Sequence, residues 1–293
     1  MLTEELGRAS VQEAFAHCRK IALGHYENFS IASWLLPARL RPHMYALYAY
    51  CRGVDDLGDE ARGDRPALLD QWEAELRRCY TGTPRDIRLV ALQATIRQFD
   101  LPPEPFERLI EANRRDQRTG EYQTYEGLLE YCSYSANPVG RLVLHVFGYT
   151  DELRRELSDA TCTALQLTNF WQDVSRDMEK GRIYIPLEDM RTFGYSPDDL
   201  RAGRQTAEFR RLMAFELART RDLFLRGLGL VPLVSGRLRF DLRMFSLGGL
   251  AVIDVIERAD YGVLQRRPRL GKARKAWLAL RALAPVPTAR GPR

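Results

Sequence analysis

The chain has 293 residues, of which 45% are hydrophobic and 28% are charged, a composition that excludes the intrinsically disordered and fibrous classes. No run approaches the roughly 18 apolar residues of a membrane span, since even the most apolar stretch, 245–256, includes Asp254. The polar N-terminus lacks the basic start and apolar stretch of a secretory signal. We therefore expect a globular, cytoplasmic protein that does not cross a membrane.

Basic residues are concentrated at the C-terminus. Residues 265–293 contain nine Arg or Lys and no Asp or Glu, whereas the rest of the chain has 35 basic and 39 acidic residues. The net charge of +5 therefore comes from this tail. A nucleic-acid-binding protein more often carries its basic surface over the folded domain, so we expect no nucleic-acid partner. Peripheral binding to an anionic membrane is the preferred interpretation of the tail, and a merely solvated basic terminus is the alternative.

Apolar residues recur at helical spacing along most of the chain, and no run alternates as a strand does. This pattern predicts an all-α protein. The short connections predict one α domain over residues 1–264, followed by the tail over 265–293. Pro138 should break or kink the helix in which it lies. The helices are predicted near 10–23, 40–60, 66–80, 86–99, 104–118, 125–147, 151–178, 197–203, 206–228 and 240–264.

A first acidic segment lies at the end of the helix predicted over 40–60. At about 100° per residue, Asp55 continues the apolar side that Met44 and Leu47 define, and Asp59 lies about 40° away. Burying an unpaired carboxylate costs several kcal/mol, so these side chains need a proton, a cationic partner or a metal ion. The alternative is that this segment is a fraying helix end that faces water.

A second acidic segment lies in the helix predicted over 151–178. Helical spacing places Gln166, Asn169, Asp173 and Asp177 on one side. The two aspartates are four residues apart and repel each other unless a cation lies between them. A solvated polar face is the alternative.

Oxygen ligands without a His or Cys cluster favour Mg²⁺ over zinc, and the five scattered cysteines contain no CxxC pair. Mg²⁺ usually binds one or two carboxylates together with phosphate oxygens. We therefore expect the two acidic helices to face each other across a metal-bound diphosphate. Arg52 and Arg182 are the predicted cationic contacts of the diphosphate. Surface ion pairing is the alternative for both, in a chain with 40 arginines and four lysines.

Together these segments resemble the aspartate-rich signatures of the squalene/phytoene synthase family. The pattern YxxxR-xx-DxxxD falls on Tyr48, Arg52, Asp55 and Asp59. The pattern QxxN-xxx-DxxxD, followed by a GRxYxP-like loop, falls on Gln166, Asn169, Asp173, Asp177, Arg182 and Tyr184. The resemblance covers most of residues 20–264 and implies a single-domain, isoprenoid-synthase-like helical bundle with a central cavity.

The resemblance also implies the role of each residue. The implied Mg²⁺ ligands are Asp55, Asp59, Asn169, Asp173 and Asp177. The implied diphosphate contacts are Tyr48, Arg52, Gln166, Arg182 and Tyr184. His25 and Asn28 fall where relatives usually have a serine-rich diphosphate motif, and they are further candidates for this role. For His25, a structural hydrogen bond is the alternative.

Two stretches, HYENFSxAS at 25–33 and SANPVGR at 135–141, resemble the bacterial hydroxysqualene synthase branch of the family. This branch implies conversion of presqualene diphosphate to hydroxysqualene in squalene and hopanoid synthesis, through ionisation, rearrangement and capture of water. Asn137 would hold the attacking water, unless it only forms an Asn-Pro turn. Aromatic residues that would face the cation, or else belong to the core, are Phe29, Tyr131, Tyr134, Phe170 and Trp171.

Other functions stay open from the sequence. Within the family, the alternative is a head-to-head condensing synthase that makes presqualene diphosphate or phytoene. Outside it, the alternatives are a non-catalytic helical scaffold and a nucleic-acid binder, the latter supported by the pI alone. The expected partners are a prenyl or triterpenyl diphosphate substrate and the neighbouring enzymes of the pathway through functional coupling.

Overall fold

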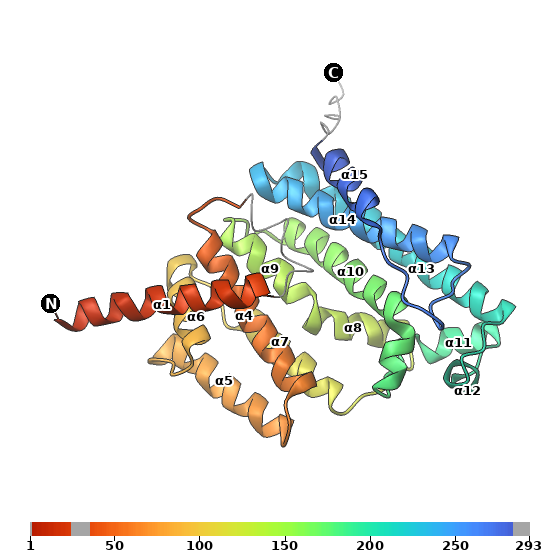
Figure 1. Cartoon of the computed structure of the whole chain (residues 1–293), viewed down its shortest axis with the longest axis horizontal. Helices are drawn as coiled ribbons and strands as arrows, with labels where there is room; N and C mark the ends of the chain where they lie inside the picture. Colours follow the sequence, from red (N-terminus) through yellow and green to blue (C-terminus); the bar gives the residue numbers. More distant parts are fainter. Residues whose placement is uncertain (1, 25–35, 284–293) are drawn as a thin grey trace. The chain divides into compact units, whose positions relative to one another are not determined.

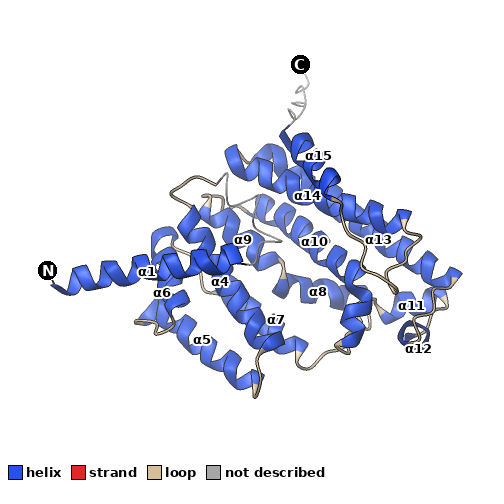
Figure 2. Cartoon of the chain, in the orientation of Figure 1, coloured by secondary structure: helices blue, strands red, loops and turns tan. Residues whose placement is uncertain are grey.

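The computed structural model describes residues 2–24 and 36–283, and most of these residues are helical. Within these residues no strand is present, only an isolated parallel bridge between Glu121 and Ile183 (Figure 2). The predicted all-α class is therefore confirmed. The chain divides into two compact units: unit 1 comprises Met1–Thr119 and Ser133–Asp151, and unit 2 comprises Gly120–Cys132 and Glu152–Arg293. The expected boundary at residue 264 stays a prediction.

Unit 1 is a helical assembly centred on one helix that carries the first acidic segment. Its elements are α1 (Leu2–Gly24), α4 (Arg41–Asp55), the π-helix η1 (Asp56–Glu60), α5 (Arg65–Thr81), α6 (Ile87–Phe99), α7 (Glu104–Asp116) and α9 (Asn137–Val146) (Figure 1). Helix α4 packs against α1, α6 and α7, so its apolar positions are buried on several sides. This packing holds the helix that leads into the acidic segment.

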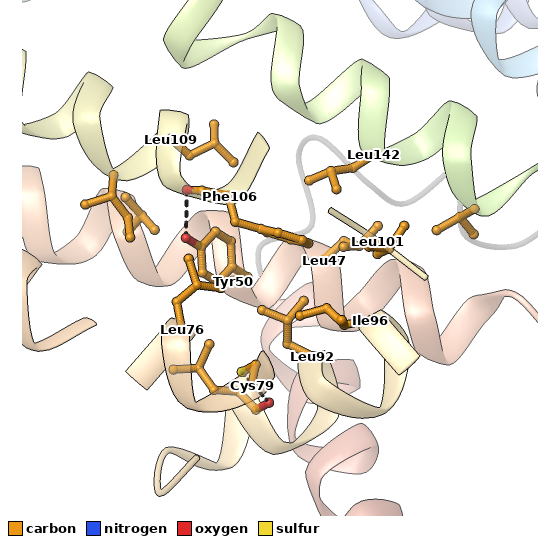
Figure 3. Packing of buried hydrophobic residues seen from close by; sticks show 14 of the residues in the cluster. Leu47, Tyr50, Leu76, Cys79, Leu92, Ile96, Leu101, Phe106, Leu109 and Leu142 are labelled. Atoms are coloured by element: carbon orange, nitrogen blue, oxygen red, sulfur yellow. Dashed lines mark hydrogen bonds between the residues drawn. The ribbon is translucent and has the colours of Figure 1, made fainter. Parts of the chain in front are cut away.

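Tyr50 anchors α4 in the core of unit 1. Its ring is fully buried and meets the ring of Phe106 edge-on, with 5.1 Å between the centroids. Its hydroxyl donates a hydrogen bond to the Phe106 carbonyl oxygen over 2.9 Å (Figure 3). A buried phenol needs such a partner, because an unpaired hydroxyl would lose its bond to water without replacement. The bond therefore fixes α4 to the first turn of α7.

Unit 2 is built around the long helix that carries the second acidic segment. Its elements are α8 (Tyr125–Ser135, whose last three residues belong to unit 1), α10 (Glu152–Glu179), α11 (Leu187–Phe193), α12 (Pro197–Arg201), α13 (Ala207–Gly227), the 3₁₀ turn η2 (Leu228–Leu233), α14 (Gly236–Arg258) and α15 (Lys272–Leu283). Helix α10 packs against α13 and α14. Trp171 of α10 is fully buried, and its Nε1 donates to Thr220 Oγ1 of α13 over 2.8 Å.

The helix pattern of the sequence is largely reproduced. The break expected at Pro138 is confirmed, because α8 ends at Ser135 and α9 begins at Asn137 with the proline in its first turn. Three expectations are wrong in detail. Helix α1 begins at Leu2, well before residue 10, the last turn of 40–60 is a π-helix, and the seven-residue helix α11 was not predicted. Among the described residues, no helix is both long and apolar enough to span a membrane.

Two adjacent glycines of α14 provide a matched test of packing. A Cβ on Gly249 would lie 2.0 Å from Cζ of the fully buried Phe224, whereas a Cβ on Gly248 would have no atom within 4 Å. We expect Gly249→Ala to lower the free energy of unfolding by about 1–3 kcal/mol through overpacking. Gly248→Ala should leave it unchanged or raise it by up to about 1 kcal/mol through helix propensity. Urea denaturation of both variants checks this, and equal values would contradict the packing described.

Candidate functional site

The first acidic segment is a π-helical continuation of α4. The backbone N–H of Ala61 donates to the Asp56 carbonyl over 2.8 Å, the five-residue spacing of a π turn. A π turn holds more residues than an α turn, so Asp55 and Asp59 are separated by about one full turn. The 100° spacing assumed from the sequence therefore does not apply here, and that both aspartates share a side stays a prediction. Single π turns are rare and frequently mark functional sites.

Helix α7 holds this acidic turn from the side. A Cβ on Gly58 would lie 2.0 Å from Asn113 Oδ1, so only glycine lets the two segments approach this closely. The buried Asn113 hydrogen-bonds the Asp55 carboxylate and donates through Nδ2 to the Leu109 carbonyl. Gln117 Nε2 donates to the Gly58 carbonyl over 2.9 Å. The position of Asp55 is therefore set by a second helix as well as by its own.

The electrostatic surroundings of Asp55 disfavour its ionised form. Displacement of water by protein atoms raises the pKa of this carboxyl from 3.8 to about 6, and the charge of Asp59 acts in the same direction. The hydrogen bond from Asn113 and the charge of Arg52 oppose that increase. The residue still exposes surface to solvent, so a cation has access to it. Added positive charge would stabilise the ionised form of both carboxyls.

Arg52, a predicted diphosphate contact, pairs with the acidic residue that directly follows each of Asp55 and Asp59. Its Nη2 lies 2.6 Å from Asp56 Oδ1 and 2.7 Å from Glu60 Oε1. These two acids are partly exposed and paired with Arg52, rather than only solvated. Tyr48 lies one turn earlier on α4 and is half-buried. A phosphate group that binds Arg52 would therefore replace one or both carboxylates as its partner.

The second acidic segment lies on α10, which is not regular there. Asp173 has φ −106° and ψ 15°, outside the helical range, so the helix is kinked at the first of the two aspartates. The two faces nevertheless separate as the spacing predicts. Leu167, Trp171 and Val174 are buried, whereas the predicted site residues are half-buried or exposed. Those residues are Gln166, Asn169, Asp173 and Asp177.

Asp173 is bound by an arginine that the sequence analysis missed. Arg267, in the loop between α14 and α15, places Nε 2.5 Å from Asp173 Oδ1 and Nη2 2.8 Å from Oδ2. The neighbouring Pro268 carbonyl accepts a hydrogen bond from Gln172 Nε2, and Arg176 Nη1 lies 3.7 Å from Asp173 Oδ1. Local spacing could not reveal Arg267, because it lies 94 residues from its partner. Its position in the RRPR stretch was the only signal.

The loop after α10 brings Asp177, Arg182 and Tyr184 around one small pocket, together with Phe170. The backbone N–H of Arg182 donates to the Asp177 carbonyl over 2.9 Å, which closes the turn. The ring of Tyr184 is buried and stacks on Phe170 with 3.7 Å between the centroids. The loop therefore positions an arginine beside the second aspartate of the pair.

The remaining predicted residues lie in different surroundings. Asn137 is buried as the first residue of α9, and Arg115 lies 3.8 Å over the ring of Tyr134 in unit 1. Tyr131 packs against Tyr184 and Phe170 within an aromatic cluster of unit 2, and Trp171 is in the core beside Thr220. His25, Asn28 and Phe29 are outside the described residues.

Each acidic segment therefore supplies a pair of aspartates rather than a complete metal cage. Among residues 2–24 and 36–283, no three His, Cys, Asp or Glu side chains form a group that could hold a metal ion. Pairs of carboxylates suit Mg²⁺, which keeps water ligands and takes others from substrate phosphates. That the two pairs share one metal-bound diphosphate stays a prediction.

Comparison with known proteins identifies the family. The sequence model of the family described as squalene/phytoene synthase matches residues 23–274, which include both acidic segments. The chain belongs to the squalene/phytoene synthase family. The 15-cis-phytoene synthase of Synechocystis sp. is 33% identical over 94% of this chain and 88% of its own length. Phytoene synthase 1 of Zea mays is 31% identical over 92% of this chain and 68% of its own.

Solved structures of this family have the same helical fold. The crystal structure of squalene synthase HpnC from Alicyclobacillus acidocaldarius is 52% identical, with a TM-score of 0.84 over 86% of this chain and 96% of that one. A dehydrosqualene synthase in complex with a ligand is 26% identical, with a TM-score of 0.85 over 94% of this chain and 97% of that one. The isoprenoid-synthase-like fold expected from the sequence is therefore confirmed.

The pairing of Arg267 with Asp173 leads to a testable coupling. Arg267→Gln removes the nearer of the two arginines that pair with the half-buried Asp173 in the described structure, so we expect the free energy of unfolding to fall by roughly 1 kcal/mol. Arg266→Gln, at the exposed neighbouring position, is the matched control and should have little effect. A double-mutant cycle with Asp173→Asn, followed by urea denaturation, should give a coupling of about 0.5 kcal/mol or more. Additive effects would mean that the ion pair contributes nothing to stability.

Proposed function

We propose that this protein converts presqualene diphosphate to hydroxysqualene with Mg²⁺ as cofactor, in squalene and hopanoid synthesis. The observation that carries the proposal is the pair of aspartates on each acidic segment, each with an arginine beside it. The 52% identity to a squalene synthase over most of the chain supports a triterpene substrate. The SANPVGR stretch, with Asn137 buried at a helix start, supports the branch that adds water.

The donor set of the site fits Mg²⁺. The proposed ligands are Asp55 and Asp59 in unit 1, and Asn169, Asp173 and Asp177 in unit 2, all of which offer hard oxygen atoms. The raised pKa of Asp55 is compatible with the same assignment, because loss of water and the neighbouring acidic charges outweigh the hydrogen bond from Asn113 and the charge of Arg52. When bound, Mg²⁺ would act as a Lewis acid that stabilises negative charge on the leaving diphosphate.

Residues of the chain itself would bind the diphosphate and stabilise it as it leaves. Arg52 and Arg182 would donate charge-assisted hydrogen bonds to phosphate oxygens, with Tyr48, Gln166 and Tyr184 as neutral donors. His25 and Asn28 are proposed as further contacts. The bond between the substrate carbon and the diphosphate oxygen breaks, and the electron pair leaves with the diphosphate. These donors stabilise the charge that develops on the leaving group.

The resulting cyclopropylcarbinyl cation rearranges before water attacks. Asn137 is proposed to hold that water through its side-chain amide, so that the water oxygen forms the new bond to carbon. The water then loses a proton, which balances the charge of the released diphosphate, and hydroxysqualene results. No nicotinamide-binding fingerprint is present in the sequence, which agrees with capture by water rather than by hydride.

The second candidate is a head-to-head condensing synthase that joins two prenyl diphosphates. It is favoured by the phytoene synthase relatives, which match over 90% or more of this chain. We also propose peripheral membrane association through the C-terminal segment from residue 265, since substrate and product are both lipids. Functional coupling to neighbouring pathway enzymes is proposed on the same ground.

Product analysis separates the two reactions. The purified protein is incubated with Mg²⁺ and either presqualene diphosphate or farnesyl diphosphate, in H₂¹⁸O. We expect an alcohol from presqualene diphosphate that carries one ¹⁸O, detected by mass spectrometry, and no C30 product from farnesyl diphosphate alone. Formation of presqualene diphosphate from farnesyl diphosphate would instead support the condensing synthase. Formation of phytoene from geranylgeranyl diphosphate, tested in a separate incubation, would do the same.

Metal dependence is tested with single aspartate variants. We expect EDTA to abolish turnover and Mg²⁺ to restore it. Asp55→Asn and Asp177→Asn should each lower kcat/KM by about 100-fold or more, because each removes a charged metal ligand. Asp198→Asn is the control, since that side chain is 92% exposed on α12 and belongs to neither acidic segment. Full turnover in EDTA, or equal losses in all three variants, would contradict the proposed site.

A further inference from the structure

Helix α15 exposes apolar side chains on the face that is turned away from its own unit. Helix α15 packs along α14 (Figure 1). On its inner side, Leu278 and Ala282 are only 4% and 5% exposed. Trp277 and Leu280 are 53% and 68% exposed. A helix that packs on one side of a globular protein normally presents polar residues on the other. In α15 the outer side is apolar instead.

The exposed apolar residues form one continuous stripe. Ala273, Ala276, Trp277 and Leu280 are all exposed, and their spacing of 0, 3, 4 and 7 residues places them on one helix face. We call these four residues the outer stripe of α15. Scattered exposed apolar residues are ordinary, but a continuous stripe that includes a tryptophan is typical of an interaction surface.

The outer stripe is fixed in its orientation by polar contacts on the inner side. Arg274 Nη2 donates to Asp254 Oδ2 of α14 over 2.8 Å, and Arg243 of α14 donates to the Ala282 carbonyl over 3.3 Å. These contacts lie near opposite ends of α15. They prevent the helix from rotating its apolar side toward α14, so the stripe is available to a partner.

The charge beside the stripe indicates which partner it fits. Arg281 is exposed at the edge of the stripe, with its guanidinium 5.3 Å from the ring centroid of Trp277. The segment 265–293 has nine basic residues and no acidic one. Two of these cations, Arg267 and Arg274, are paired with aspartates inside unit 2, which leaves seven others in the segment. An apolar stripe with tryptophan, in a segment of net positive charge, suits a membrane interface that contains anionic lipid.

We propose that the outer stripe of α15 inserts into the surface of a bilayer containing anionic phospholipid. This names the surface and the lipid class for the peripheral association given under the proposed function, and it rests on that association. Trp277 and Leu280 would enter the region between headgroups and acyl chains, while basic side chains of the segment remain among the headgroups. The helix lies along the membrane and does not cross it.

Vesicle sedimentation with the full-length protein tests this proposal. Wild type, the double variant Trp277→Ser/Leu280→Ser and the control Leu153→Ser/Leu225→Ser are each mixed with vesicles of phosphatidylcholine, with or without 30% phosphatidylglycerol. The control removes two leucines that are each 57% exposed on α10 and α13 of the same unit. We expect wild type and control to bind anionic vesicles, and the α15 variant to bind about tenfold or more weakly. Binding to neutral vesicles should be weaker for all three.

Three results would overturn the proposal. These are equal binding of the α15 variant and wild type, equal binding to neutral and anionic vesicles, and no binding of wild type. Concentration-dependent dimerisation of wild type that the α15 variant abolishes, without vesicle binding, would assign the stripe to a second copy of the chain. Turnover of detergent-dispersed presqualene diphosphate should be the same in wild type and variant. Its absence in both would contradict the proposed reaction but not vesicle binding.

Discussion

Carboxylates that are crowded together and partly removed from water need nearby positive charge or hydrogen-bond donors, and both acidic segments are arranged around this requirement. In unit 1 the donors are local or one helix away: Asn113 bonds Asp55, and Arg52 pairs with Asp56 and Glu60. These contacts do not remove the requirement, since the pKa of Asp55 is still raised. A bound divalent cation would meet the remaining need.

The second acidic segment meets the same requirement in another way. Asp173, at the kink of α10, receives a two-point ion pair from Arg267, which lies beyond the end of α14. Arginine suits this role because its planar fork matches both carboxylate oxygens at once. The chain has 40 arginines against four lysines. Some arginines pack on aromatic rings, since the guanidinium groups of Arg88 and Arg115 lie over the rings of Trp72 and Tyr134. Much of the arginine content therefore serves packing and pairing within each unit, and the pI alone is a poor guide to partners.

The sequence predicted those features that depend on local spacing. The buried face of Leu167 and Trp171, and the helix break before Pro138, follow from residues within one or two turns of each other. The π turn after Asp55 was not predictable in this way, because it lies where Gly58 meets Asn113 of another helix, a contact that spacing within one helix does not reveal. The ion pair between Arg267 and Asp173 was not predicted for the same reason, because its partners are 94 residues apart in the sequence. Helix α11 is too short to give a clear periodic signal, so it was not predicted.

The choice between the two family reactions depends on how many diphosphate groups the site must hold at once. A condensing synthase binds two prenyl diphosphates and ionises one of them as the cyclopropane forms, so it needs donors for two diphosphate groups. Family resemblance places a serine-rich motif at the N-terminal position in such enzymes, whereas this chain has His25 and Asn28 there. Fewer hydroxyl donors at that position suit an enzyme that starts from presqualene diphosphate and binds a single diphosphate group. An enzyme of this kind both receives and releases a triterpene lipid, and a fixed apolar stripe on α15 would keep it at the membrane where such lipids dissolve.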